Sequence, residues 1–429
     1  MEDPPAPQKP PFTLPVDADG KATEFRPFSL ASPHVRSFHL AWLSLFSCFF
    51  STFSIPPLIP IIREDLRLTE TDIGAAGIAS FVGSIFSRLA MGPACDLVGP
   101  RITSATLSLI TAPIILATSL VSSPQSFILV RFLVGFCLAN FVANQFWMSS
   151  MFSGCVVGLA NGVSAGWANM GSGVAQLLMP LIFTAISNFN VPLSTAWRLA
   201  FIVPSLFQSL TAILVLLYGQ DLPSGNYRDF KKTENDSKDE FLPVLLHGLK
   251  NYRGWILGLT YGFCFGVELT TDNIIAQYFY YKFNVKPSGS RDYRGVFRDG
   301  ELVFEADGRG VFGCYGAAVW DEREAVGIVG GADAASGLTF GVVPFVTKRS
   351  LGVISGMTGS GGTVGAVLTQ LLLFSGSKFS KQTSISLMGL MMIVCTLPVS
   401  LLYFPQSGGM FCGPSFDPNE AGEHYHLLE

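Results

Sequence analysis

Long apolar segments alternate with short polar ones along most of this chain. A helix needs about 20 mainly apolar residues to cross the hydrocarbon core of a bilayer. Ten segments satisfy this requirement, near 38–62, 73–92, 102–122, 126–150, 154–186, 198–218, 255–281, 328–346, 352–374 and 384–405. The pattern predicts an all-α polytopic membrane protein with about ten spans.

The polar stretch 219–254 interrupts this pattern after the sixth apolar segment. It is rich in Lys, Arg, Asp and Glu, which is typical of a loop in water rather than a helix in lipid. We therefore expect a cytosolic central loop between an N-terminal six-helix bundle at 38–218 and a C-terminal bundle at 255–405. Polar tails are predicted at 1–37 and 406–429.

Loop charge predicts the orientation of the spans. Lys or Arg residues occur in the N-terminal tail, in the loop that holds Arg101, in the central loop and at Lys348 and Arg349. The connections 122–126 and 187–197 carry none. Since cytoplasmic loops are enriched in Lys and Arg, and these basic segments fall on one side if the spans alternate, both termini are expected in the cytosol.

One segment of the C-terminal half departs from the pattern. Residues 286–330 are dense in Arg, Asp, Glu and Gly and contain no apolar run long enough for a membrane helix. A small extracytoplasmic module is one interpretation, but about 45 residues rarely supply a core of their own. We favour a shifted reading frame or a mis-joined exon that replaces two genuine spans.

An internal repeat supports two related halves. A shift of the chain by 190 residues superimposes three glycines of the fifth apolar segment on three glycines of the ninth without a gap. The pairs are Gly162 with Gly352, Gly166 with Gly356, and Gly171 with Gly361. Duplicated transporters show matching glycine-interrupted helices of this kind, although glycine-rich helices also match by chance.

Composition excludes several classes of protein. Of 429 residues, 49% are hydrophobic and only 14% charged, with a mean hydropathy of +0.43 and a net charge of −4. These values disfavour a soluble domain, a disordered chain and a nucleic-acid binder. The eight cysteines form no Cys-x-x-Cys pair, and no P-loop, triad or metal motif occurs. We therefore expect no enzyme activity, no metal and no cofactor.

A short loop motif follows the second apolar segment. The sequence GPACDLVGPR, from Gly92 to Arg101, resembles the G-x-x-x-D-x-x-G-x-[RK] loop of the major facilitator superfamily. Its glycines allow a tight turn, and Asp96 can cap a helix and pair with a basic residue. We expect Gly92, Asp96, Gly99 and Arg101 to act as a conformational gate between the halves.

Further segments narrow the resemblance to one family. AGWANMGSG (165–173) and GMTGSGGTVGAVLTQ (356–370) resemble the two signature helices of the nitrate/nitrite porter family, and TAWRLAF, GQDLP and GVELTTDN resemble plant high-affinity nitrate transporters. The resemblance covers about 25–285 and 331–425. It implies two pseudo-symmetric bundles, normally of twelve spans together, and proton-coupled nitrate uptake across the plasma membrane. It also implies a small single-span accessory partner.

Arg88 is the first candidate for the site. It lies in an apolar segment, near the cytoplasmic end of the second predicted span. A charge within lipid is costly and usually faces a polar cavity, and the planar guanidinium matches a flat anion. By resemblance, Arg88 is the nitrate-binding arginine of the N-terminal half. An arginine that snorkels to the interface is the alternative.

Residues of the two glycine-rich helices complete the predicted substrate site. The resemblance implies that these residues contact nitrate, and helix packing is an equal alternative for the glycines. The residues are Asn169, Gly166, Gly171, Gly359, Gly361 and Thr363. Asn169 can donate an amide hydrogen bond to an oxyanion. Thr363 stands where the family usually has Asn, and Ala168 and Ser172 stand where glycine is usual.

Inward movement of an anion opposes an inside-negative potential by about 2.3 kcal/mol per charge per 100 mV. Two protons per nitrate reverse that sign, so the site needs a group that exchanges protons. Glu268 is the predicted coupling acid, with Arg131 as the alternative centre. Asp272, one helical turn after Glu268, faces the same way, and a structural role for these groups is equally open.

The chain lacks one element of the family pattern. A second arginine within an A-R-P-x-G-G stretch of the eighth span normally completes the anion site, and no such stretch occurs here. Each charge-assisted hydrogen bond lost weakens anion binding by about 1.5–3 kcal/mol. Two alternatives therefore stand beside a nitrate symporter: a non-transporting family member without spans eight and nine, and a facilitator of nitrite or another small anion.

Overall fold

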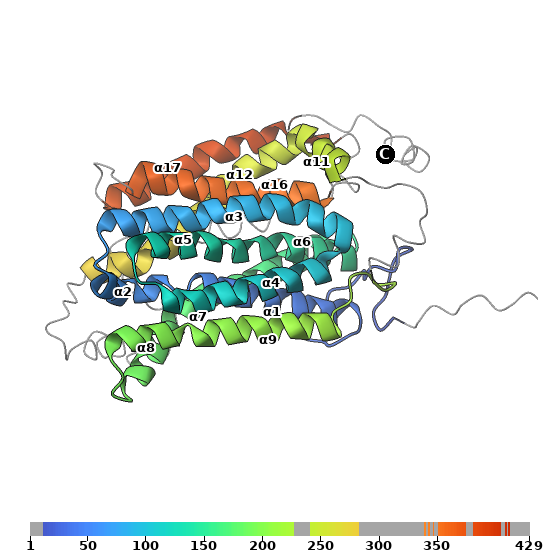
Figure 1. Cartoon of the computed structure of the whole chain (residues 1–429). Helices are drawn as coiled ribbons and strands as arrows, with labels where there is room; N and C mark the ends of the chain where they lie inside the picture. Colours follow the sequence, from blue (N-terminus) through green and yellow to red (C-terminus); the bar gives the residue numbers. More distant parts are fainter. Residues whose placement is uncertain are drawn as a thin grey trace, which may run out of the picture.

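The chain folds into a bundle of long, roughly parallel helices (Figure 1). The computed structural model describes residues 12–226, 241–282, 339, 342–343, 346, 351–374, 381–404, 408–409 and 411. Its elements are α1 (His34–Thr52), η1 (Pro56–Leu58), α2 (Ile59–Leu66), α3 (Glu70–Val98), α4 (Pro100–Ala117), η2 (Thr118–Leu120), α5 (Pro124–Val134), η3 (Gly135–Ala139), α6 (Asn140–Met151), α7 (Val157–Ser187), α8 (Leu193–Ala200), α9 (Ile202–Tyr218), α11 (Phe241–Lys250), α12 (Tyr252–Lys282), α16 (Leu351–Thr369), η5 (Gln370–Phe374), α17 (Lys381–Thr396), η6 (Leu397–Leu401), β1 (Tyr403–Phe404) and β2 (Gly408–Gly409). β1 and β2 form a short antiparallel pair.

Seven helical segments within the described residues are long and apolar enough to cross a membrane. They are His34–Leu66, Glu70–Val98, Pro100–Leu120, Pro124–Met151, Val157–Ser187, Leu193–Tyr218 and Leu351–Phe374. These confirm the first six predicted spans and the one at 352–374 as long apolar helices. The predicted span at 255–281 corresponds to α12, and the one at 384–405 overlaps a shorter apolar helix, Ser386–Leu401.

The predicted total of ten spans stays a prediction. The segment 286–330 and most of the apolar segment 328–346 lie outside the described residues. What the structure supports is a helical fold with several candidate membrane spans.

Local sequence signals explain where the long helices begin and end. At the start of α3, Thr69 Oγ1 accepts a hydrogen bond from the backbone N–H of Asp72, while Asp72 Oδ2 accepts one from the backbone N–H of Thr69. This reciprocal capping box satisfies two backbone donors that the helix leaves open. Between α3 and α4, Gly99 has φ +94°, a backbone conformation that favours glycine. The chain therefore reverses here within one residue.

The C-terminal helices lie together on one side of the bundle. Figure 1 shows α12 (yellow-green), α16 (orange) and α17 (red) above α3, with α9 at the opposite side. α16 packs on α12 and also on α3, whereas α1 packs on α7 and α9. The contact of α16 with α3 joins the two halves of the sequence, and the site described below lies along it.

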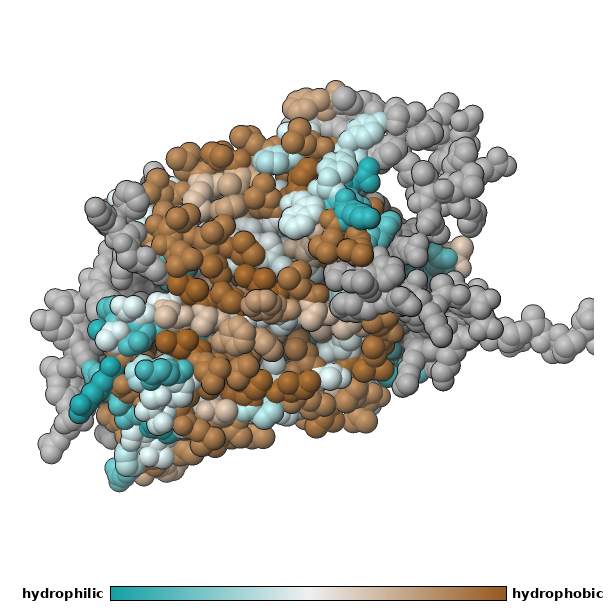
Figure 2. All heavy atoms as spheres, turned by 45° about the horizontal axis from the view of Figure 1, so that its top comes forward, coloured by the Kyte–Doolittle hydropathy of each residue, from teal (hydrophilic) through white to brown (hydrophobic). Residues whose placement is uncertain are grey.

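The outward faces of the helices are apolar. Along α9, the side chains of Leu206, Leu210 and Leu217 are all more than half exposed. Figure 2 shows hydrophobic residues covering a broad area of the bundle, with hydrophilic residues mainly toward its ends. Exposed apolar patches of this extent mark contact with lipid.

The N-terminal segment before α1 lies against the bundle. The backbone N–H of Ala22 donates to the carbonyl of Met151 over 3.0 Å, and the N–H of Ser153 donates to the carbonyl of Ala22 over 2.9 Å. Ala22 is fully buried. The helix that was expected from residue 38 begins at His34, and the described part of the predicted tail is attached to the turn between α6 and α7.

Candidate functional site

Arg88 is fully buried between the two halves of the sequence. Its Nε donates a hydrogen bond to the carbonyl of Leu138 over 3.1 Å, and its Nη1 donates to the carbonyl of Gly359. Leu138 belongs to η3 in the N-terminal half and Gly359 to α16 in the C-terminal half. The second terminal nitrogen, Nη2, is buried without a hydrogen-bond partner among the described residues. A buried donor of this kind is costly unless something else accepts from it.

Arg88 lies well inside α3. The second span was predicted to end near residue 92, whereas α3 continues to Val98, so Arg88 lies ten residues, or about 15 Å, before the helix end. Its guanidinium is held by backbone carbonyls of the two halves, a contact that an arginine snorkelling toward water does not make.

Three aromatic rings form a wall beside the guanidinium. The Cζ atom of Arg88 lies 5.1 Å from the ring centroid of Phe265 and 5.5 Å from that of Phe141. Tyr261 and Phe265 stack with centroids 4.9 Å apart and planes within 14°. Aromatic faces attract cations at this distance. The wall therefore stabilises the charge of Arg88 and keeps water from that side of it.

Glu268 lies on α12, one and two helical turns beyond the aromatic residues of the same helix. The residue is only 8% exposed, and its Oε1 accepts a hydrogen bond of 2.7 Å from Asn169 Nδ2 on α7. It also lies close enough to Arg88 for the two charges to interact. The structure thus brings three of the predicted site residues, Arg88, Asn169 and Glu268, toward the boundary between the halves.

The four predicted glycines have different surroundings. The carbonyl of Gly359 contacts Arg88 directly, whereas Gly361 is pressed against the backbone of Gly258 on α12 and Gly171 against the backbone of α1 near Phe46. A Cβ at Gly166 would meet no described atom within 4 Å. Of these four, only Gly359 touches the Arg88 group, and packing accounts for Gly171 and Gly361.

Thr363 and Arg131 lie apart from the hydrogen bonds of Arg88. Thr363 is buried, and its hydroxyl donates to the carbonyl of Ser360 in its own helix over 2.9 Å. Arg131 is 3% exposed and donates to the carbonyl of Thr52 over 3.3 Å, within the N-terminal half. Asp272 lies outside the residues whose side chains the structure describes.

Residues of the loop motif at the end of α3 contact the C-terminal half of the chain. Gly92 and Gly352 face each other so closely that neither position has space for a Cβ atom. The carboxylate of Asp96 accepts a hydrogen bond of 3.1 Å from the backbone N–H of Gly352, in the first turn of α16. A carboxylate at a helix N-terminus is favoured by the helix dipole. Asp96 was expected to cap a helix, and the helix it caps is α16.

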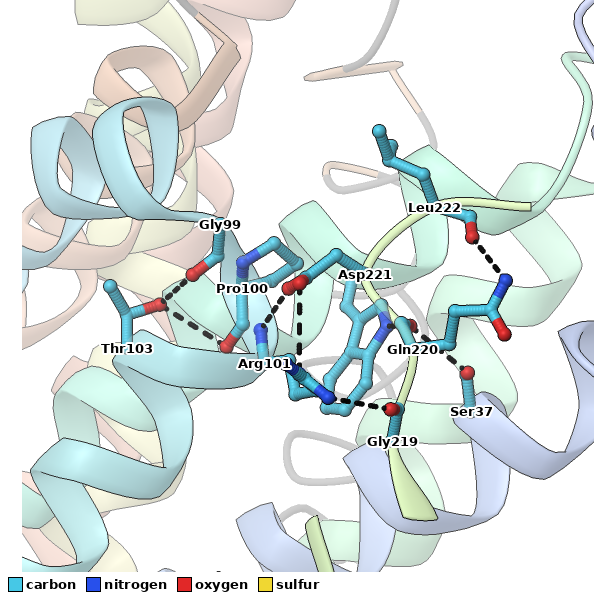
Figure 3. A network of polar contacts seen from close by, with 10 residues as sticks. Ser37, Gly99, Pro100, Arg101, Thr103, Gly219, Gln220, Asp221 and Leu222 are labelled. Atoms are coloured by element: carbon cyan, nitrogen blue, oxygen red, sulfur yellow. Dashed lines mark hydrogen bonds and ion pairs between the residues drawn. The ribbon is translucent and has the colours of Figure 1, made fainter. Parts of the chain in front are cut away.

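Arg101 takes a partner that the sequence did not indicate. Its backbone N–H donates to Asp221 Oδ1 over 2.9 Å, its Nη1 donates to the carbonyl of Gly219 over 3.1 Å, and its Nε lies 3.6 Å from Asp221 Oδ2. Figure 3 shows Asp221 above Arg101, next to Gln220, whose carbonyl accepts from Ser37. The turn after α9 is thereby tied to the turn between α3 and α4 and to α1.

The aromatic wall was not predicted from the sequence. Tyr261, Phe265 and Glu268 follow one another at spacings of four and three residues, which places them on one face of a helix. This periodicity was the available signal. It is weak, because aromatic residues at helical spacing occur throughout the apolar segments of this chain.

Comparisons with known proteins give the family. The model of the Major Facilitator Superfamily matches residues 41–413. High affinity nitrate transporter 2.7 of Arabidopsis thaliana is 56% identical, with 95% of this chain and 91% of that protein covered. High-affinity nitrate transporter 2.3 of Oryza sativa subsp. japonica is 52% identical, with 98% of this chain and 87% of that protein covered. Both alignments extend over 452 positions, more than the 429 residues of this chain.

Solved structures give the same fold. The proton:xylose symporter XylE superimposes with a TM-score of 0.59 over 86% of this chain and 95% of that chain, at 12% sequence identity. The human organic anion transporter MFSD10 gives a TM-score of 0.51 over 85% of this chain and 99% of that chain. At these identities the likeness concerns the fold alone. With the family match and the two plant relatives, it identifies this chain as a multi-pass membrane protein of the plant high-affinity nitrate transporter family, within the major facilitator superfamily.

Proposed function

We propose that this chain carries nitrate across the plasma membrane together with protons, by alternating access of two helical bundles. The plant relatives support nitrate as the substrate, since their names state high-affinity nitrate transport. The fold supports the mechanism, because transporters of this architecture rock two bundles around a site near the middle of the membrane. Arg88 lies where such a site is expected, on the contact of α3 with α16.

The observation that carries this proposal is the unpartnered Nη2 of Arg88. It offers two N–H donors in the plane of the guanidinium, from a side chain that is fully buried. A planar anion of one charge accepts from such a donor through one of its oxygens, and the resulting hydrogen bond is charge-assisted. Because Nη1 binds a carbonyl of the C-terminal half and Nε one of the N-terminal half, an anion on Nη2 is bound where the halves meet.

In this proposal Glu268 is the residue that couples proton movement to nitrate transport. A carboxyl group gains and loses a proton, whereas an arginine stays charged at every physiological pH. The electrostatic interaction of Glu268 with Arg88 links proton binding to anion binding. When nitrate occupies Arg88, its negative charge favours the neutral, protonated form of the nearby carboxyl group. Arg131, which donates to the carbonyl of Thr52 within the N-terminal half, is the alternative centre and the weaker candidate, because its guanidinium stays charged at physiological pH.

Orientation and partners are part of the same proposal. The N-terminal segment and the turns at Arg101 and Asp221 are joined at one end of the bundle through Ser37 and Gln220. This arrangement supports a common, cytosolic side for the basic segments, with both termini in the cytosol. Nitrate, protons, bilayer lipid and a small single-span accessory protein are the proposed partners.

Uptake of labelled nitrate into a transport-null cell tests the proposal. Arg88→Lys keeps the charge but loses the planar pair of donors, and Arg88→Ala loses both. Loss of one charge-assisted hydrogen bond corresponds to about a tenfold or larger rise in KM. We therefore expect Arg88→Lys to raise KM by at least about tenfold, and Arg88→Ala to abolish uptake.

Arg198→Lys is the matched control. Arg198 lies on α8, well after α3 in the sequence, and forms a partly exposed ion pair with Asp65, 2.8 Å away. Surface quantities of all variants are compared by biotinylation. A wild-type chain at the cell surface without uptake would instead support the non-transporting alternative. Stronger uptake of nitrite than of nitrate in competition would support the small-anion facilitator.

A further inference from the structure

We propose that Asn169 is a positioning residue for Glu268. Its carboxamide forms one hydrogen bond to Glu268 when that acid is ionised and one when it is protonated, and in both states this bond joins the two halves of the chain. The proposal rests on the proposed role of Glu268 in proton coupling. It assigns Asn169 a task other than the nitrate contact that the family resemblance implies.

The contact itself joins the two halves of the molecule. Asn169 lies on α7 in the N-terminal half and Glu268 on α12 in the C-terminal half. Asn169 Nδ2 donates to Glu268 Oε1 over 2.7 Å, the short end of the range for a hydrogen bond to a charged acceptor. Glu268 is almost fully buried, so water is a poor substitute for this partner.

Glu268 interacts electrostatically with Arg88 of α3. Among the described residues, the part of α16 that packs on α12 is rich in glycine, with Gly361, Gly362 and Gly365 against α12, and η1 consists of Pro and Leu. Asp272, one helical turn after Glu268, lies outside the residues whose side chains the structure describes. Asn169 is a neutral polar partner that reaches Glu268 from the opposite half.

A carboxamide is suited to an acid that changes its protonation. An ionised carboxylate only accepts hydrogen bonds, whereas a protonated carboxyl group also donates one. The amide of Asn169 carries a donor, Nδ2, and an acceptor, Oδ1, on one planar group. Oδ1 is buried with no hydrogen-bond partner among the described residues, so this acceptor is available when the donor is no longer needed.

The proton balance is simple. A proton from water on the outer side binds a carboxylate oxygen of Glu268, and the new O–H donates to Asn169 Oδ1 after the amide turns about its terminal bond. Release of that proton to water on the cytosolic side restores the carboxylate, and Nδ2 donates again. No covalent bond of Asn169 forms or breaks. The amide thus keeps α7 and α12 linked through both halves of the proton cycle.

Asn169→Leu removes both hydrogen-bonding groups at similar size and tests this role. The measurement is the pH profile of maximal nitrate uptake and the KM for nitrate. We expect the pH profile of Asn169→Leu to differ from that of the wild type while KM changes little, and no further change when Asn169→Leu is added to Glu268→Gln. A rise in KM of about tenfold or more with an unchanged pH profile would show a direct nitrate contact and overturn the proposal.

Asn161→Leu is the matched control. Asn161 lies on the same helix, is 1% exposed, and donates to the hydroxyl of Ser149 over 3.5 Å. It has the same side chain as Asn169 in a more buried place, and among the described residues its hydrogen-bond partner is a hydroxyl rather than an acid. If Asn161→Leu altered the pH profile as Asn169→Leu does, the effect would belong to the stability of α7 and the proposal would fail.

A spectroscopic measurement separates this proposal from the proposed function. Infrared pH-difference spectra of the purified protein in lipid nanodiscs identify the carboxylic C=O band of Glu268 as the one that Glu268→Gln removes. Loss of a hydrogen bond shifts such a band to higher frequency, and we expect this shift in Asn169→Leu but not in Asn161→Leu. The shift would support the proposal even in a chain that moves no nitrate. A band that does not respond to Asn169→Leu, or the absence of any band that Glu268→Gln removes, would overturn it.

Discussion

At the scale of single residues, two glycines decide how closely the halves approach. A Cβ at Gly352 would overlap the carbonyl oxygen of Gly92 and would lie 2.7 Å from Asp96 Oδ2. Both obstacles belong to α3: one is backbone, and the other is the carboxylate that caps α16. Close helix approach in membranes depends on small residues of this kind. The contact of α3 with α16 therefore has no space for even one additional methyl group.

We predict that Gly352→Ala lowers the thermal unfolding midpoint of the purified protein in nanodiscs. The added methyl group must push α16 away from α3, which weakens the hydrogen bond from Gly352 to Asp96. Gly162→Ala is the matched control, because Gly162 is the repeat counterpart of Gly352 and a Cβ there would meet no described atom within 4 Å. A drop of equal size in both variants would contradict this explanation.

Residue-scale reasoning from the sequence singles out side chains that conflict with their surroundings. Arg88 and Glu268 stand out because a charge in an apolar segment needs a reason. Phe141 and Phe265 gave no such signal, because aromatic residues are ordinary in membrane helices, and only the fold brings a residue of η3–α6 and one of α12 beside the same guanidinium. The carbonyl contacts of Arg88 could not be predicted either, since every residue has a carbonyl.

At the scale of elements, the turn between α3 and α4 is locked by a buried ion pair. The side chain of Asp221 is 1% exposed and that of Arg101 is 19% exposed. Asp221 Oδ1 accepts a hydrogen bond from the backbone N–H of Arg101, and Asp221 Oδ2 lies 3.6 Å from Arg101 Nε as an ion pair. The sequence pointed to Arg101 through the loop motif, but its partner lies in a turn 120 residues later in the chain. Pairing over such a separation depends on the assembled bundle.

We predict a graded loss of stability at Asp221. Asp221→Asn keeps an oxygen for the backbone N–H of Arg101 and loses the ion pair. Asp221→Ala loses the ion pair and also leaves the backbone N–H of Arg101 without its acceptor. Removal of one partner from a buried pair costs about 3–5 kcal/mol, so the unfolding midpoint should fall in the order wild type, Asn, Ala.

Glu24→Ala provides the contrast for this series. Glu24 pairs with Arg26 on the surface, where their side chains are 46% and 64% exposed. Exposed pairs contribute at most about 1 kcal/mol, so its unfolding midpoint should remain near that of the wild type. Equal losses in Glu24→Ala and Asp221→Ala would argue against a structural lock at the α3–α4 turn.

At the scale of the whole molecule, the two glycine-rich helices have different surroundings. Gly352 and Gly356 of α16 pack against α3, but their repeat counterparts on α7, Gly162 and Gly166, meet no described atom. The repeat implies that a helix equivalent to α3 belongs on α7. The family resemblance predicts the eighth and ninth spans in the part of the sequence that the polar segment 286–330 occupies.

We predict that replacing residues 286–330 by the corresponding stretch of Arabidopsis high affinity nitrate transporter 2.7 increases nitrate uptake by at least about tenfold. The reason is the second arginine that the family resemblance implies for that stretch, whose guanidinium would add charge-assisted hydrogen bonds to the anion. The same graft with that arginine changed to Ala is the control, and should gain little. Equal uptake by the native chain and the graft would mean that the native segment already supplies what transport needs.

Most of the fold could be predicted from the sequence, because spans of membrane helix follow from apolar length alone. The six helical segments of the N-terminal half agree with their predicted positions within a few residues. Their ends were less predictable: α3 runs to Val98, past Pro93, and a short helix, α11, lies within the predicted central loop. α3 differs because its helix continues into the loop motif beyond the apolar run, and α11 because its ten mainly apolar residues are too few for a membrane span.

The turn after α9 holds the start of the connection between the two bundles in place. The carbonyl of Gln220 accepts from Trp147 Nε1 over 2.7 Å and from Ser37 Oγ over 3.1 Å, so the chain is anchored as far as this turn. The next described helix, α11, packs on α3 and α16. Both described ends of the connection between the bundles are therefore held against helices, the first by α1 and α6 and the second by α3 and α16. We expect a rotation of one bundle against the other to move these anchors as well, so that contacts at both ends of the connection contribute to the geometry of rocking.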